Sequence, residues 1–137
     1  MKRVLVLCTG NSCRSQMAEG WLRHFLGSRA EVFSAGIVAS GLNPKAVAVM
    51  KESSIDISRH TSKRVDELSQ QEFDFVITVC DNAKEHCPHF PATSKQFHQD
   101  FEDPTYAIGS PDEVMGAYRT TRDQLKKYCE EFVNENL

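Results

Sequence analysis

Apolar residues follow two patterns along the chain, short continuous runs and runs with helical spacing. Residues 4–7 form a continuous apolar run, which is typical of a parallel strand buried on both faces. Residues 73–79 are a second strong strand candidate. Residues 31–34 and 95–98 are shorter and weaker strand candidates. We therefore expect four strands, with 95–98 the weakest of them.

Apolar residues three and four positions apart predict three helices between or after these strands. The first covers residues 17–26 and ends at Gly27, a typical helix stop. The second covers residues 44–52, where Asn43 is a good N-cap before a proline. The third begins at the capping-box sequence of residues 110–113 and continues nearly to the C-terminus.

This alternation of strands and helices, without a repeat, low-complexity tract or linker, predicts one domain over residues 1–137. The expected fold is α/β, a single open, mainly parallel four-stranded sheet with helices on both faces. Ligands of such sheets bind outside the carboxyl ends of the strands. Cys8 and Cys80 follow the first and third predicted strands, so both are candidates for a site there.

The charge balance limits the classes of partner. Sixteen Lys and Arg against nineteen Asp and Glu give a net charge of −3, which does not favour nucleic acid or anionic membranes. An anion must therefore be bound by a local site. No apolar run approaches the ~18 residues of a membrane span, and residues 4–7 are too short for a signal-peptide core. We expect a cytoplasmic protein.

Five cysteines form a poor disulfide framework, because their number is odd and their spacing is irregular. Reactive thiols are the better explanation for some of them. Zinc bound by Cys80, His86, Cys87 and His89 is an alternative, but the short cysteine pair of most zinc sites is missing and no metal is predicted. The five are Cys8, Cys13, Cys80, Cys87 and Cys129.

The loop between the first strand and the first helix predicts an oxyanion site. Its backbone N–H groups and the helix N-terminus form an anion cradle, and the Arg14 guanidinium can bind two oxygens. The same field favours the Cys8 thiolate, to which Ser15 can donate a hydrogen bond. The alternative is a buried cysteine beside a surface arginine. The predicted oxyanion-binding residues are Thr9, Gly10, Asn11, Ser12, Cys13, Arg14 and Ser15.

Residues 8–20 resemble the N-terminal signature of the arsenate reductases built on the low-molecular-weight protein tyrosine phosphatase fold. Residues 34–36, 43–46, 55–58 and 60–62 are similar to further segments of that family. The resemblance therefore extends through almost the whole chain. It implies a phosphatase-like fold and a cysteine nucleophile.

The pair Asp103-Pro104 would be a turn by itself, but the resemblance implies that Asp103 protonates the leaving oxygen. General acid catalysis of this kind contributes ~10²–10⁴ in rate. The neighbouring Glu102 is the less favoured candidate. Phosphatases of this fold usually place two aromatic residues after the pair, whereas Thr105 precedes Tyr106 here, which weakens the case for an aryl phosphate substrate.

Residues 80–88 resemble the paired-cysteine segment of the thioredoxin-coupled arsenate reductases. The resemblance implies a relay in which Cys8 attacks arsenate, Cys80 attacks Cys8 and releases arsenite, and Cys87 attacks Cys80. A transient Cys8–Cys80 disulfide and a final Cys80–Cys87 disulfide follow. Thioredoxin is the expected external reductant, glutaredoxin the less favoured one, and no bound cofactor is expected.

The spacing of the pair implies a conformational change. If residues 80–87 were helical, a ~1.5 Å rise per residue would separate the α-carbons by roughly 10 Å, beyond the ~7 Å that a disulfide permits. We therefore expect oxidation to reorganise residues 80–90. Cys13 and Cys129 are predicted to be packing residues.

Some relatives bind potassium beside the loop through an asparagine, a glutamate, a serine and an aspartate. Asn11, Glu19 and Ser34 match three of these, but Lys63 is at the position of the aspartate. The Lys63 ammonium is expected to replace the ion by pairing with Glu19, which predicts little potassium dependence. The alternative is that Lys63 is a solvated charge of the loop.

The sequence therefore favours a monomeric arsenate reductase for arsenic detoxification, with Cys8, Cys80, Cys87, Arg14 and Asp103 as catalytic residues. Weak phosphatase activity is expected, because phosphate and arsenate are similar oxyanions. The alternatives are a low-molecular-weight phosphatase with incidental thiols and a non-enzymatic redox sensor that binds oxyanions.

Overall fold

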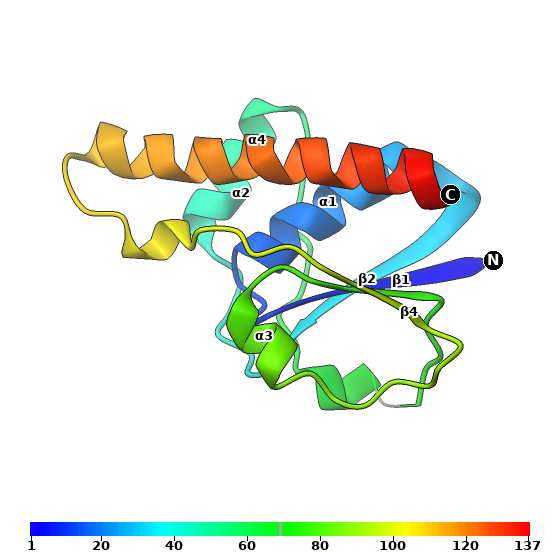
Figure 1. The fold of residues 1–137 in the computed structure, drawn as a ribbon. Coiled ribbons are helices and arrows are strands. Elements are labelled where there is room, and N and C mark those ends of the chain that lie inside the picture. Colours follow the sequence, from blue (N-terminus) through cyan, green and yellow to red (C-terminus); the bar gives the residue numbers. More distant parts are fainter. Residues whose placement is uncertain (69) are drawn as a thin grey trace.

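A computed structural model describes residues 1–68 and 70–137 and shows a four-stranded parallel sheet with the strand order β2-β1-β3-β4 (Figure 1). The strands and helices in chain order are β1 (Lys2–Cys8), α1 (Arg14–Leu26), β2 (Ala30–Gly36), α2 (Pro44–Glu52), β3 (Phe75–Thr78), α3 (Asp81–Glu85), β4 (Lys95–His98) and α4 (Pro111–Asn136). Short 3-10 turns are η1 (Gly27–Arg29), η2 (Val65–Leu68) and η3 (Pro104–Tyr106). The α/β fold class predicted from the sequence is confirmed.

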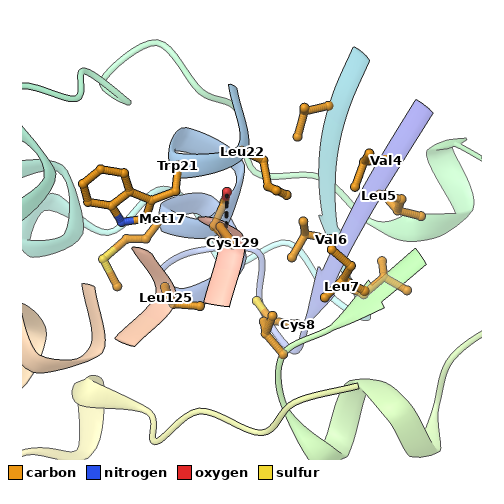
Figure 2. Close-up of a cluster of buried hydrophobic side chains, with 14 of the residues drawn as sticks. Val4, Leu5, Val6, Leu7, Cys8, Met17, Trp21, Leu22, Leu125 and Cys129 are labelled. Atoms are coloured by element: carbon orange, nitrogen blue, oxygen red, sulfur yellow. Dashed lines mark hydrogen bonds between the residues drawn. The ribbon is translucent and has the colours of Figure 1, made fainter. Parts of the chain in front are cut away.

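The central strand β1 explains why its sequence is a continuous apolar run. Its neighbours β2 and β3 pair with it on both edges, and helices or loops cover both faces, so residues 4–7 are fully buried. Side chains of β1, α1 and α4 meet in one cluster, which includes Trp21, Leu22 and Leu125 (Figure 2). This core holds the carboxyl end of β1, and with it Cys8, in a fixed place.

Helices α1, α2 and α4 cover one face of the sheet, whereas the short α3 and η2 lie at the other (Figure 1). The predicted caps are confirmed. Asn43 accepts hydrogen bonds from the N–H groups of Lys45 and Ala46, and Ser110 forms a capping box with Glu113. No helix within the described residues is long and apolar enough to cross a membrane.

The third strand is shorter than the apolar run at residues 73–79 predicts. Phe73 packs in the core ahead of the strand, while the Asp74 carboxylate accepts a hydrogen bond from the Arg3 N–H group. Beyond the strand, the Val79 N–H group still donates to the Leu7 carbonyl. The chain thus stays beside β1 until Cys80, which lies at the same sheet edge as Cys8, as expected.

Candidate active site

A cavity of about 230 Å³ opens at the carboxyl end of β1. It brings Asp103, which is distant in sequence, next to Cys8 and Arg14 of the N-terminal loop. Its lining residues are Cys8, Thr9, Gly10, Ser12, Cys13, Arg14, Ser40, Asp103 and Thr105. A larger cavity of about 390 Å³, between residues 65–73 and 88–91, has no thiol or guanidinium group among its described lining residues.

The backbone of the loop at residues 9–13 is bound to the rest of the protein through its carbonyl groups. Residues 37–43 run beside the loop, and four of their N–H groups donate to the carbonyls of residues 8, 9, 10 and 12 at 2.9–3.2 Å. Within the described chain, no hydrogen bond to protein uses the N–H groups of residues 10–13. Helix α1 also begins without a side-chain cap. Such a set of unused donors is an anion-binding arrangement.

Ser15 lies directly behind the sulfur of Cys8, with 2.8 Å between Oγ and Sγ. The Asn11 side-chain amide donates to the same Ser15 oxygen at 2.9 Å. Because that oxygen already accepts this bond, its own proton is free to point at the sulfur. Ser15 therefore donates to Cys8, in the arrangement that stabilises a thiolate.

Asn11 fixes the shape of the loop from inside the protein. Its φ of 47° is in the left-handed region, which asparagine tolerates better than most residues. Its Oδ1 accepts from the Lys63 N–H group at 2.9 Å, and its Nδ2 also donates to Ser34 at 2.9 Å. The side chains of Asn11 and Ser15 are thus fully buried supports and are not among the groups that line the cavity. Asn11 can contact an oxyanion only through its backbone.

Arg14 and Asp103 both line the cavity and form an ion pair with each other. Arg14 donates to the Phe101 carbonyl at 2.9 Å and to Asp103 Oδ2 at 3.3 Å, and its side chain is 11% exposed. The second carboxyl oxygen of Asp103 accepts from the N–H and hydroxyl groups of Thr105 at 3.0 and 2.7 Å. The Thr105 bonds therefore hold Asp103 independently of Arg14, so its other oxygen can face a ligand.

Cys13 lines the cavity but is 4% exposed. Burial raises the pKa of its thiol strongly, and the nearby negative charges of Asp103 and Cys8 raise it further. The Cys13 thiol is therefore protonated at neutral pH. Cys129 is also buried, its thiol lies 3.8 Å from the Ala18 carbonyl, and burial raises its pKa (Figure 2). Both surroundings fit the predicted packing roles.

Cys80 lies beside the first residue of the loop, Thr9. Its sulfur caps α3 by accepting from the Ala83 N–H group at 3.4 Å. It is also 3.3 Å from the hydroxyl of Thr9. Since the Thr9 oxygen accepts from the Asn82 amide at 3.0 Å, its proton is free to point at the Cys80 sulfur. Thr9 thus connects Cys80 to the loop that carries Cys8.

Cys87 is half-buried in different surroundings. It lines a cavity of about 160 Å³ with Lys84, Thr78 and His98, at the edge of the sheet formed by β4. Burial raises the pKa of its thiol. Helix α3 covers only residues 81–85, so it separates Cys80 from Cys87 but includes neither. All five cysteines are free thiols.

The expected pairing of Lys63 with Glu19 is wrong. The Lys63 ammonium donates to the Thr61 carbonyl at 3.1 Å and is exposed. Glu19 is paired instead with Arg23, one helical turn along α1 at 2.8 Å, and approached by His60 at 3.5 Å. Arg23 and His60 thus take the positions beside the Glu19 carboxylate that were expected for Lys63. Burial is the largest cause of the lowered pKa of His60, although Glu19 raises it.

Ser40 and Thr105 are site residues that the sequence analysis did not single out. Ser40 reaches the cavity because residues 37–43 run beside the loop, a tertiary contact without a local sequence pattern. Thr105 follows Asp103-Pro104, and an Asx-type turn there was predictable from those residue types. Among the described residues, no three His, Cys, Asp or Glu side chains are grouped to hold a metal ion.

Comparison with known proteins agrees with this geometry. Residues 3–137 match the low molecular weight phosphotyrosine protein phosphatase family. The chain belongs to this family. The family match covers both the loop of residues 8–15 and the Asp103 region, so the cavity is made of residues within the matched segment.

Within the family, the similar proteins include both reductases and phosphatases. An arsenate reductase of Halalkalibacterium halodurans is 46% identical over 131 residues, which are 96% of this chain and 94% of that protein. A solved arsenate reductase in the phosphate binding state has a TM-score of 0.81 at 32% identity, covering 98% of each chain. A low molecular weight protein tyrosine phosphatase from T. tengcongensis has a TM-score of 0.81 at 30% identity, covering 98% of this chain and 99% of that one.

Proposed function

We propose that this protein reduces arsenate to arsenite through a covalent arsenic adduct on Cys8 and a relay over Cys80 and Cys87. The observation that carries the proposal is the position of Cys80. Its thiol lies 3.3 Å from Thr9, the residue after Cys8, while Arg14 and Asp103 line the adjoining cavity. A phosphatase has no need of a second thiol at this point. The arsenate reductase similarity points to the same substrate.

In the first step, the Cys8 thiolate attacks arsenate held by Arg14 and by the N–H groups of residues 10–13. An oxyanion at Arg14 replaces the Asp103 oxygen that lies 3.3 Å away, which leaves that carboxyl group next to the ligand. Asp103 takes a proton from the bound dihydrogen arsenate and transfers it to the departing hydroxyl group, which leaves as water. The product is an S–As(V) bond on Cys8.

In the second step, the Cys80 thiolate attacks the Cys8 sulfur and breaks the S–As bond. The electron pair of that bond stays on arsenic, which leaves as arsenite, and a Cys8–Cys80 disulfide forms. Cys87 then attacks Cys80 and releases the Cys8 thiolate. An external dithiol of the thioredoxin type then reduces the Cys80–Cys87 disulfide and is itself oxidised to a disulfide. Each cycle therefore transfers two electrons to arsenic. A glutaredoxin system is the alternative reductant.

The test is arsenate-dependent NADPH oxidation with thioredoxin and thioredoxin reductase. The unaltered protein should turn over repeatedly, and Cys80→Ser and Cys87→Ser should each stop after at most one arsenate per protein. Cys129→Ala, a thiol buried away from the cavity, is the matched control and should turn over normally. Repeated turnover by Cys80→Ser would contradict the relay.

A phosphatase is the second candidate, favoured by the similarity to the T. tengcongensis enzyme. Cys8, Arg14 and Asp103 contain the groups that ester hydrolysis needs. Two results together would establish this function instead: the unaltered protein does not turn over arsenate, and Cys80→Ser hydrolyses an aryl phosphate as fast as the unaltered protein does. Absence of both activities would favour a redox sensor.

A further inference from the structure

His98 and Asp81 form a contact outside the cavity that the relay described above does not use. His98 is the last residue of β4, and Asp81 is the first residue of α3, directly after Cys80. His98 Nε2 lies 2.7 Å from Asp81 Oδ1, and His98 Nδ1 lies 2.7 Å from the hydroxyl of Thr78. Thr78 and His98 are partners in the β3–β4 register, so the ring is held by the sheet itself.

The hydrogen bonds define the direction of this contact. The Asp81 carboxylate can only accept, so the Nε2–H group of His98 donates to it. The Thr78 hydroxyl, which also lies 3.4 Å from the Phe97 carbonyl, can donate to Nδ1 of the neutral ring. The Asp81 N–H group donates to Asp100 Oδ1 at 3.1 Å. Asp81 is therefore held at both its backbone and its side chain by the chain around the end of β4. Asn82, one residue on, is held from the other side by Thr9.

Cys80 is thus held between two anchors, the loop through Thr9 and Asn82, and strand β4 through Asp81. His98 also lines the cavity that contains Cys87. The His98 ring therefore lies beside the cavity of Cys87 and also contacts Asp81, the residue next to Cys80. This arrangement holds Cys80 beside the loop, whereas Cys87 lies on the β4 side of α3.

We propose that His98 is a positioning residue, which acts through Asp81 to hold Cys80 in place for its attack on Cys8. This inference rests on the proposed function. Because displacement by ~1 Å can cost as much as 10²-fold in rate, loss of the contact should slow that attack by about tenfold. The contact is partly exposed, at 22% for His98 and 69% for Asp81, so it should contribute little to global stability.

The experiment measures a single disulfide exchange in a Cys87→Ser background, where the relay stops at Cys8–Cys80. Reduced protein is mixed with arsenate, quenched at intervals and analysed by mass spectrometry for the Cys8–Cys80 disulfide. His98→Ala should slow its formation about tenfold, and Asp81→Ala, which leaves β4 unaltered, should do the same. His98→Gln keeps an N–H donor near the position of Nε2 and should restore most of the rate.

Two readouts separate positioning from a general structural effect. Affinity for inorganic phosphate, measured by calorimetry, should be unchanged in all variants, because none of the altered residues lines the 230 Å³ cavity. The matched control is His86→Ala, an exposed histidine at the end of α3 whose ring contacts only the Asn82 carbonyl among its described hydrogen bonds. It should leave the exchange rate unchanged.

Each outcome decides between two ideas. If the Cys87→Ser parent forms no Cys8–Cys80 disulfide with arsenate, the proposed function is wrong, and this inference falls with it. If the parent forms the disulfide but His98→Ala and Asp81→Ala form it equally fast, only the inference is wrong. A slow His98→Gln variant, or an equally slow His86→Ala control, would also overturn it.

Discussion

Ser15 connects the sulfur of Cys8 to a chain of buried hydrogen bonds. The chain runs from Ser15 through Asn11 and Ser34 to Glu19, with contacts of 2.6–2.9 Å. Each group in it is oriented by the next, so the Ser15 hydroxyl is preorganised toward the sulfur and needs no rearrangement when charge develops there.

Ser15→Ala should therefore reduce the reactivity of Cys8. A hydrogen bond to a charged group contributes about 1.5–3 kcal/mol, so alkylation of Cys8 by iodoacetamide at pH 7 should slow roughly tenfold or more. Mass spectrometry can follow Cys8 separately from the other thiols. Ser34→Ala removes a hydroxyl two hydrogen bonds further from the sulfur and should have a smaller effect. An equal effect would show that the Ser15 hydroxyl does not act on Cys8 directly.

Gly36 determines how closely β2 approaches the anion loop. A Cβ atom there would lie 2.7 Å from the Asn11 nitrogen and 2.8 Å from the Thr9 oxygen, and it would collide with the Val38 carbonyl. All three neighbours are backbone atoms, which cannot rotate away. No side chain fits at this position without displacing the loop.

Gly36→Ala should lower the free energy of unfolding by at least about 1–3 kcal/mol, the usual cost of overpacking. It should also weaken phosphate binding, because the displaced backbone carries the N–H donors. Urea denaturation and calorimetry with inorganic phosphate measure the two effects. Gly116→Ala, inside α4 where a Cβ meets nothing within 4 Å, is the control: it should leave phosphate binding unchanged and raise the free energy of unfolding by about 0.5–1 kcal/mol.

At the scale of elements, α3 is a single helical turn between two thiols that the proposed relay must join. Its own backbone bonds include those from the Lys84 N–H group to the Cys80 carbonyl and from the His86 N–H group to the Asn82 carbonyl. A Cys80–Cys87 disulfide requires the two α-carbons within ~7 Å, which a helix between them opposes.

Oxidation should therefore break α3. Hydrogen exchange at the amides of residues 84 and 86 should become faster in the oxidised protein than in the reduced one. The amides of α4 serve as the internal reference, because this helix is remote from the disulfide in sequence and contacts mainly α1 and α2. Equal protection of residues 81–87 in both states would show that the disulfide forms without unwinding.

The elements that local chemistry defines were predictable from the sequence. Asn43 and Ser110 carry their capping signals in adjacent residues, and the loop of residues 8–15 combines all its chemistry within one segment. The partners of Glu19 were not predictable as a set. The spacing of four residues between Glu19 and Arg23 was visible in the sequence. His60, however, belongs to a distant segment, and it lies beside Glu19 where Lys63 was expected. The contact of Asp81 with His98 likewise depends on the β3–β4 register.

For the whole molecule, a cluster of charged side chains joins α2 to α4. Glu52 of α2 pairs with Arg119 and Arg122 of α4, each with a contact of 2.9 Å. Hydrogen bonding to Arg119 is the largest cause of the lowered pKa of Glu52, which falls from 4.5 to about 2. Burial also lowers the pKa of His60, which lies beside Glu19 of α1, from 6.5.

Both shifts predict loss of stability in acid. The unfolded chain binds a proton at His60 more readily than the folded one, so stability should begin to fall as the pH drops below 6.5. The Glu52 contribution is present above pH 4.5 and is lost as the pH falls toward 2, because the unfolded carboxylate takes up its proton first. Urea denaturation between pH 8 and pH 3 should therefore show two successive declines.

Substitution separates the two declines. Glu52→Gln cannot carry the charge, so its stability should be lower than that of the unaltered protein at pH 7, and the difference should shrink as the pH falls from 4.5. His60→Gln should remove the decline that begins near pH 6.5 and leave the lower one intact. A difference between the unaltered protein and Glu52→Gln that stays constant from pH 7 to pH 3 would show that the ion pairs with α4 do not cause the acid sensitivity.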